Sequence, residues 1–266
     1  MKTKDYGMVA LLIFLAMFIW LRDRSWMSTS DDTLPIIVAI PLFVWLATPW
    51  EWREDSLPLK GTWIVVAILS FVIGIATNLT ILLAVGWTSL MWSWLSVRLN
   101  PKSLPSIKKL LILPIMAFPW VALDAQLIGW WFRLSGASVA AQLFHVGGLA
   151  VTHEGTQLVI NGIPLSVEAA CSGLNTLQSM LIAGSIVAYL YLGEAKDYWI
   201  NLLWLPIMAW IANTIRIITI GISALAISPE FAMGPFHDIG GWLILFLMFC
   251  LCWLMFSVQA PKKSKS

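Results

Sequence analysis

Long apolar runs dominate the sequence and constrain the fold more than any other feature. A helix that crosses a bilayer needs about 20 mostly apolar residues. Eight segments meet this requirement: residues 6–21, 34–50, 61–77, 80–97, 110–133, 171–192, 198–217 and 236–258. With 59% hydrophobic and only 11% charged residues, the chain is far less charged than a soluble domain. The pattern predicts an all-α polytopic membrane protein and excludes the soluble, fibrous and disordered classes.

Charge and cysteine content exclude further classes. The net charge of +2 provides no strongly basic surface, so no nucleic-acid partner is expected. Three cysteines are too few for a disulfide framework. Cys250 and Cys252 share the last predicted span, where a metal or redox pair is an alternative to simple packing. Positions two apart face different sides of a helix, so we expect no metal site and no cofactor.

The basic residues orient the predicted spans, because cytoplasmic loops are enriched in Lys and Arg. An N-terminus on the cytoplasmic side places 12 of the 16 basic residues there: Lys2, Lys4, Arg53, Lys60, Arg98, Lys102, Lys108, Lys109, Lys196, Lys262, Lys263 and Lys265. No Lys or Arg occurs from Leu134 up to Lys196. The loop at 134–168 is therefore expected on the external face, and membrane lipids surround the spans.

This external loop has a pattern of its own. Residues 135–148 are Ala-rich and predict a short interfacial helix. Three β-like runs follow at 149–153, 156–160 and 163–168, separated by Glu154-Gly155 and Asn161-Gly162, dipeptides that suit tight hairpin turns. We expect a small β-meander before the sixth span. The predicted organisation is N-terminal helices at 1–133, the external loop at 134–168, catalytic helices at 169–258 and a basic cytoplasmic tail at 259–266.

Three reactive side chains are predicted at one depth. Arg216 lies 18 residues after Tyr198, or about 27 Å along a helix, close to the hydrocarbon thickness. Cys171 opens the sixth span and His237 opens the eighth, and both spans descend for about 32 Å. Three helix ends should therefore bring a thiol, a guanidinium and an imidazole together on the outer face.

The chemistry of this trio suits acyl transfer. A helix N-terminus and a nearby cation both favour the nucleophilic thiolate form of Cys171. His237 could take the thiol proton and return one to a leaving amine. Arg216 could stabilise an oxyanion or hold the substrate backbone. Asp238 or Glu168 could orient the imidazole, and the sequence leaves this choice open.

Each of these residues also has a simpler interpretation. A cysteine in an apolar segment is usually a small buried residue, and a histidine at a helix start is often only interfacial. An arginine within a span can pair with a backbone carbonyl. Asp124, inside the fifth predicted span, suits either a functional role or a structural partner for another helix.

Three segments resemble the motifs of the exosortase/archaeosortase family. Residues 168–174 read EAACSGL and are similar to its nucleophile motif. Residues 213–216 read NTIR, an Asn three residues before an Arg, and residues 237–242 read HDIGGW, a His that opens the last helix. The order of the three motifs and their placement at predicted outer helix ends carry the resemblance, which covers residues 150–258 well.

The resemblance implies a multi-pass cysteine transpeptidase of the cell inner (cytoplasmic) membrane with its active site on the periplasmic or external face. Its partners would be secreted proteins with a C-terminal motif, a transmembrane helix and a basic cluster, and an acceptor amine. By the same resemblance Cys171 is the nucleophile, Arg216 the oxyanion or substrate-positioning group and His237 the acid–base residue, with Asn213 as a supporting residue.

Two other classes compete with this interpretation. A transporter or channel would line its path with Arg216 and Asp124, but no repeat relates two halves of the chain and the polar residues gather at one face. A structural or assembly protein would bind a partner through the external loop and would not need the thiol.

Overall fold

The computed structural model describes residues 3–28, 30–53, 57–166 and 173–261. It is mostly helical with one three-stranded sheet, as the sequence predicts. Five helical segments in this described part are long and apolar enough to cross a membrane: Asp5–Arg22, Thr80–Arg98, Leu174–Leu192, Tyr198–Ala226 and Ile239–Gln259. Thr33–Leu46 and Gly61–Thr77 are shorter apolar helices. The chain is therefore a multi-pass membrane protein that divides into two compact units, 1–124 and 125–266.

The first unit is built around helix α4 (Thr80–Arg98), most of whose side chains are buried. Gly86 of α4 lies so close to α3 (Gly61–Thr77) that an added Cβ would sit 2.9 Å from the Phe71 ring. Trp87 donates to the backbone oxygen of Leu12 at 2.7 Å and so ties α4 to α1 (Thr3–Arg22). The unit also contains η1 (Ser25–Ser28), α2 (Ser30–Leu46), α5 (Leu104–Lys109), α6 (Ile112–Met116) and α7 (Trp120–Asp124).

Asp124 has a structural partner inside this unit. One of its carboxylate oxygens accepts a hydrogen bond from the backbone N–H of Ile81 at 2.6 Å. This contact satisfies one of the free N–H groups in the first turn of α4, as a capping side chain does. This contact supports the interpretation of Asp124 as a structural partner for another helix.

The predicted fifth span at 110–133 is not one helix. The short helices α5, α6 and α7 cover Leu104–Asp124, and a new helix, α8 (Gln126–Val146), begins after them. Pro114 and Pro119 explain the break, because proline lacks the N–H that a continuing helix needs and restrains the residue before it. Helix α8 also includes the predicted interfacial helix at 135–148 and crosses the boundary at residue 133. The four-part functional division of the chain stays a prediction.

The predicted β-meander is confirmed. Strands β1 (Val151–Glu154), β2 (Gln157–Ile160) and β3 (Ile163–Ser166) pair antiparallel in the order β1-β2-β3. The register sets Glu154 opposite Gln157 and Ile160 opposite Ile163. Positive φ angles occur at Gly155, Asn161 and Gly162, as expected for these tight turns.

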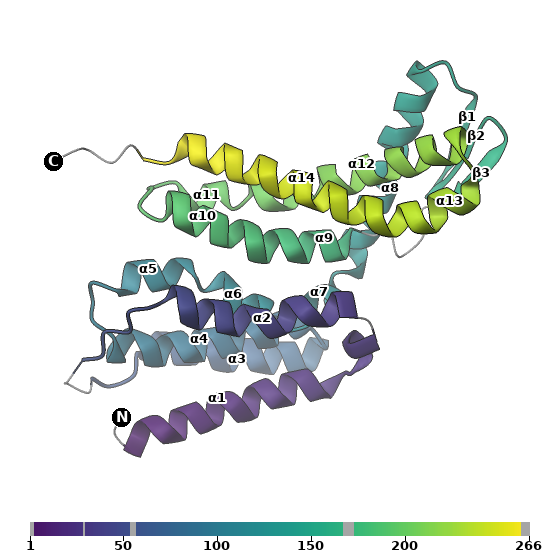
Figure 1. Ribbon diagram of the computed structural model, residues 1–266. Coiled ribbons are helices and arrows are strands. Elements are labelled where there is room, and N and C mark those ends of the chain that lie inside the picture. Colours follow the sequence, from purple (N-terminus) through teal and green to yellow (C-terminus); the bar gives the residue numbers. More distant parts are fainter. Residues whose placement is uncertain (1–2, 29, 54–56, 167–172, 262–266) are drawn as a thin grey trace. The chain divides into compact units, whose positions relative to one another are not determined.

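One face of the sheet packs into the core of the second unit. The buried side chains of this core come from the sheet, from α8, from α12 (Trp204–Ala226) and from α13 (Pro229–Met233): Ala137, Ala140, Phe144, Leu158, Ile160, Leu165, Ile217, Ile220, Ala224 and Ala232. Figure 1 shows the sheet at the end of the helices where α12 turns into α13. Gly221 allows close packing there, because an added Cβ would lie 2.6 Å from the Phe144 ring.

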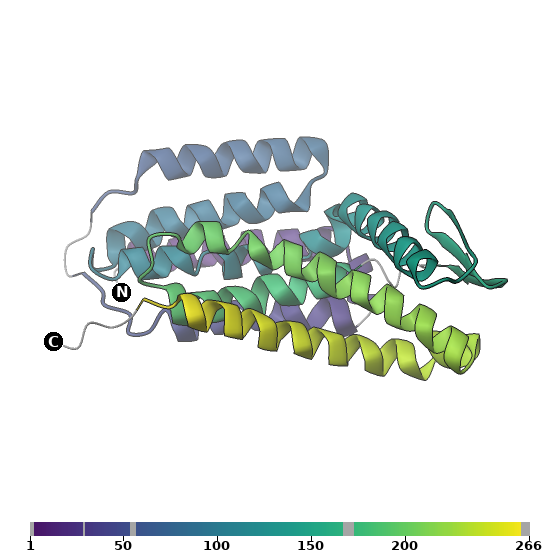
Figure 2. The same ribbon diagram turned by 90° about the horizontal axis from the view of Figure 1, so that it is seen from above.

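The remaining helices of this unit run side by side. The sixth predicted span forms a continuous helix of α9 (Leu174–Ser179), a π-helical turn, η3 (Met180–Gly184), and α10 (Ser185–Leu192). A short α11 (Tyr198–Asn201) leads into α12, and α14 (Pro235–Gln259) ends the unit. Figures 1 and 2 both show α12 (light green) beside α14 (yellow), in agreement with their contacts.

The predicted end of the seventh span at residue 217 is wrong. Helix α12 continues to Ala226, because its last turns bury Ile217, Ile220 and Ala224 against α8 and the sheet. Arg216 therefore lies in the middle of a helix and not at its end. The apolar pattern alone could not separate the part of this helix that faces lipid from the part that faces the sheet.

Candidate functional site

Arg216 and His237 meet in the structure. Nη2 of Arg216 lies 3.3 Å from Nδ1 and 3.2 Å from Nε2 of the His237 ring, and it donates to the His237 backbone oxygen at 3.1 Å. Both side chains are partly buried. Two polar residues 21 positions apart in the sequence are thus in direct contact, as the depth estimate predicted.

The turn between α12 and α14 makes this contact possible. The Ser228 hydroxyl accepts from the backbone N–H of Phe231 at 3.2 Å and caps the short helix α13. The His237 N–H then donates to the Gly234 oxygen at 3.0 Å in the first turn of α14. The chain therefore reverses over residues 227–234 and returns His237 to the level of Arg216.

A glycine makes room for the guanidinium. An added Cβ at Gly241 of α14 would lie 3.0 Å from both Cζ and Nη2 of Arg216 and 3.2 Å from Nε. These distances are shorter than the 3.5–4.0 Å of an ordinary carbon contact. The Arg216 side chain therefore lies flat against the bare backbone of α14, which only glycine allows at this position.

A second glycine brings the motif that contains Cys171 to the same place. Gly173 caps α9 with a φ of 73°, and an added Cβ would lie 2.8 Å from Cγ of Asn213. Asn213 is three residues before Arg216, so the two side chains project from neighbouring turns of one helix face. The segment that follows Cys171 in the sequence thus enters the unit one helical turn from Arg216.

Three predicted site residues cannot be placed in full. Cys171 and Glu168 lie outside the described residues, and for Asp238 only the backbone, within α14, is described. The structure therefore brings Arg216 and His237 into contact, and Asn213 lies one turn before Arg216 on α12. The roles of all these residues, and the choice between the two carboxylates, stay predictions.

The cluster contains polar atoms without hydrogen bonds. Asn213 is only 1% exposed, yet neither its amide nitrogen nor its amide oxygen has a hydrogen-bond partner among the described residues, and Nε of Arg216 is also buried without one. Buried polar groups are normally paired, because an unpaired one costs about 1–3 kcal/mol. These groups make the surroundings of Asn213 and Arg216 a polar position within an otherwise apolar unit.

Helix lengths indicate the depth of the cluster. From His237 to Gln259, α14 covers 22 residues, or about 33 Å, which matches the hydrocarbon thickness. His237 is therefore expected at a membrane boundary, and Arg216, in contact with it, at the same level. The ten residues of α12 after Arg216 extend about 15 Å beyond that level, together with the sheet.

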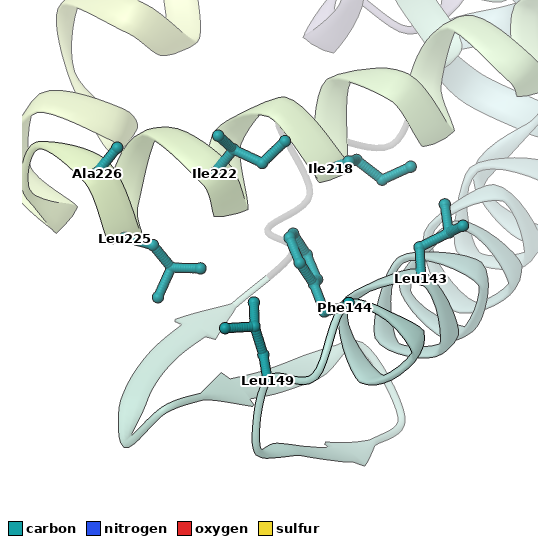
Figure 3. A pocket seen from close by; sticks show the side chains of 8 residues that line it. Leu143, Phe144, Leu149, Ile218, Ile222, Leu225 and Ala226 are labelled. Atoms are coloured by element: carbon teal, nitrogen blue, oxygen red, sulfur yellow. The ribbon is translucent and has the colours of Figure 1, made fainter.

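A groove of about 450 Å³ between α8 and α12 is apolar. Figure 3 shows side chains from α8, from the segment before β1 and from α12 around one space, and the lining residues are Leu143, Phe144, Gly147, Leu149, Ile218, Ile222, Leu225 and Ala226. None of them can transfer a proton or attack a carbonyl. Chemistry is therefore assigned to the polar cluster and not to this groove.

The described residues contain no group of three or more His, Cys, Asp or Glu side chains that could hold a metal ion. Cys250 is exposed and Cys252 is buried, so the two thiols face different sides of α14.

The packing roles of Gly173 and Gly241 were not predicted from the sequence. A signal was present, since adjacent glycines inside an apolar helix cost about 1 kcal/mol each and indicate a close approach. The partner of such a glycine cannot be deduced without the structure.

The fold and the cluster define a class: a multi-pass membrane protein in which an arginine in mid-helix contacts a histidine in the first turn of the last helix, with an asparagine packed on a glycine one turn before the arginine. Within that class, the chain belongs to the transmembrane exosortase family, because the family model described as Transmembrane exosortase (Exosortase_EpsH) matches residues 2–254. No curated protein and no solved structure matches the chain. The family processes sorting signals of protein substrates and generally consists of cysteine transpeptidases.

Proposed function

We propose that this protein is a membrane-embedded cysteine peptidase and transpeptidase that cleaves the C-terminal sorting signal of secreted proteins. Cleavage forms a thioester on Cys171, and an acceptor amine then takes the acyl group. The contact between Arg216 and His237, at 3.1–3.3 Å, is the observation that carries this proposal. This contact joins the guanidinium of Arg216 to the imidazole of His237. Asn213, one turn before Arg216, packs on Gly173 of the nucleophile motif.

Each residue has a distinct task in the reaction. His237 takes the proton of the Cys171 thiol and later protonates the leaving amine. Arg216 holds the imidazole ring and the first turn of α14 in place, and its positive charge favours the thiolate. Asp238 and Glu168 are the candidates for orienting the ring from its other side.

We place the site on the external face of the cytoplasmic membrane. Lys196 follows α10, and Lys262, Lys263 and Lys265 follow α14 in the sequence. The hydrogen bond from Trp253 to Tyr191 at 2.6 Å joins these two helices near the same ends, far from His237 along α14. Basic residues mark the cytoplasmic side, so this arrangement supports an external cluster.

Two substitutions at the thiol test the proposal. Cys171→Ala and Cys171→Ser should abolish cleavage of a tagged reporter that ends in a short motif, an apolar helix and a basic cluster. Both variants should still insert in the membrane at the parent level. Normal reporter cleavage by either variant would refute the proposed function.

A labelling experiment tests the topology separately. A membrane-impermeant maleimide added to intact cells or spheroplasts should label Cys171 in a variant with Cys250→Ala and Cys252→Ala. Labelling only after the cytoplasmic side is exposed would refute the external location but not the chemistry.

A further inference from the structure

The Asn213 side chain has no task in the steps assigned to Cys171, Arg216 and His237. It is 1% exposed, and both polar atoms of its amide are unpaired. The neighbouring Thr214 is different, since its hydroxyl donates to the Trp210 oxygen at 2.9 Å within its own helix. Of these two neighbouring side chains on α12, Asn213 therefore has no hydrogen-bond partner among the described residues, whereas Thr214 has one.

The amide of Asn213 packs against Gly173 of the nucleophile motif. Its Cγ, Cβ and Oδ1 atoms lie 2.8–3.0 Å from the position of an added Cβ on Gly173. Gly173 follows Cys171 by two residues in the sequence. A neutral N–H donor beside a cysteine that forms an acyl-enzyme is suited to bind the oxygen of the carbonyl under attack.

The arginine is less suited to that task. Nη2 of Arg216 already contacts the ring and the backbone oxygen of His237. Its Nε is buried beside Gly241. A substrate oxygen bound at Nη2 would compete with the contact that positions the imidazole, whereas both polar atoms of the Asn213 amide are unpaired among the described residues.

We infer that Asn213 is the oxyanion donor of the acylation step, and this inference rests on the proposed function. The Cys171 thiolate forms an S–C bond to the scissile carbonyl carbon, and the π electrons of the carbonyl move to its oxygen. The amide N–H of Asn213 donates a hydrogen bond to that oxygen. When the electron pair returns, the C–N bond breaks, and the leaving amine takes the proton that His237 accepted from the thiol.

Asn213→Leu tests the inference, because leucine keeps the branched shape and removes the donor. Loss of one oxyanion donor lowers kcat by about 10²–10³-fold. The single-turnover rate of reporter cleavage at saturating reporter should fall by that factor while KM changes little. Thr214→Val is the matched control: it removes a hydroxyl that is satisfied within the helix and should keep the rate within about threefold.

Alkylation of Cys171 by iodoacetamide separates catalysis from structure. This reaction displaces iodide at a saturated carbon and forms no oxyanion, so it needs a reactive thiolate but no oxyanion donor. Asn213→Leu should therefore keep the alkylation rate within about twofold. A parallel fall of alkylation and cleavage would assign Asn213 a structural role and overturn the inference.

Asn213→Asp covers the case in which leucine disturbs folding, because aspartate has the same size. Its carboxylate repels an oxyanion, so cleavage should fall at least as far as with leucine. Cleavage within about threefold of the parent in either variant overturns the inference. If Cys171→Ala also cleaved the reporter, the proposed function itself would fail, so the two failures are distinguishable.

Discussion

Gly241→Ala isolates the contact between Arg216 and α14. The new Cβ would lie 3.0 Å from Cζ and Nη2 of Arg216, whereas ordinary contacts need 3.5–4.0 Å. The guanidinium must therefore give way by a few tenths of an ångström. Its contacts with His237 are now 3.1–3.3 Å long, and such a shift lengthens them toward about 3.6 Å, where a hydrogen bond is lost.

The expected effect falls on catalysis and not on folding. A displacement of about 1 Å in a catalytic constellation can lower the rate about 10²-fold, so a shift of a few tenths of an ångström is expected to lower it about tenfold, or by about 1.4 kcal/mol of activation free energy. Alanine is a better helix former than glycine by about 0.5–1 kcal/mol, so part of the strain in α14 is offset. We expect Gly241→Ala to lower the kcat for reporter cleavage about tenfold, with a thermal midpoint near that of the parent.

Gly240→Ala is the matched control for this variant. It makes the same substitution one residue earlier in the same helix, where the added Cβ would meet the Phe236 ring at 3.2 Å and not Arg216. The ring can turn aside, so activity should stay within about threefold of the parent. Equal cleavage rates for the two variants, measured at matched protein levels, would refute the argument that Gly241 positions the guanidinium.

Four further substitutions test other contacts. Gly173→Ala should abolish reporter cleavage and destabilise the protein by at least about 1–2 kcal/mol, because it adds a clash to a positive φ. Gly162 has a φ of 83° but open space around it. Gly162→Ala should therefore destabilise the protein in thermal unfolding without abolishing reporter cleavage. Ser228→Ala removes the cap of α13 and should cost about 1 kcal/mol in a denaturation series. Asp5→Asn weakens the buried ion pair with Arg98, 2.8 Å long, and should lower the thermal midpoint at low and high salt alike.

Acidification should also act on the cap of α13. Backbone and side-chain hydrogen bonds, the latter from Ser228, hold the pKa of the exposed Glu230 below its usual value of 4.5. A carboxyl with a lowered pKa stabilises the folded state above its unfolded pKa, and this contribution disappears as the pH falls through the folded value. Ser228→Ala should therefore reduce the acid sensitivity of the thermal midpoint below about pH 4.5. An unchanged pH profile would argue against this contact.

Helix periodicity and the cost of charge in a membrane were enough to predict most of the fold. The predicted bounds of 61–77 and 80–97 match α3 and α4 within a residue, because Asn78 turns the chain in the left-handed region between two uniformly apolar runs. The prediction failed at 110–133, where the mean apolar character hid two prolines. Proline position, and not hydropathy, decides whether such a segment forms one helix.

The site was predictable in part for a similar physical reason. Arg216 and His237 could be matched from sequence because helix rise converts residue counts into depth. The neighbours of Asn213 could not be predicted from the sequence, because its close approach to Gly173 depends on which faces of α9 and α12 meet. Composition and spacing contain no information on that rotation.

The corrected length of α12 changes the interpretation of Arg216. An arginine ten residues from the end of a long apolar helix would ordinarily be expected inside the bilayer, at a considerable cost. The last turns of α12, however, bury Ile220 and Ala224 against the sheet and α8. Part of the apolar surface of this helix thus belongs to a protein core, and the residues after Arg216 need not face lipid. The sheet is therefore compatible with a charged residue in mid-helix at the membrane boundary, where the proposed function needs Arg216 and His237 to meet a substrate segment that emerges from the bilayer.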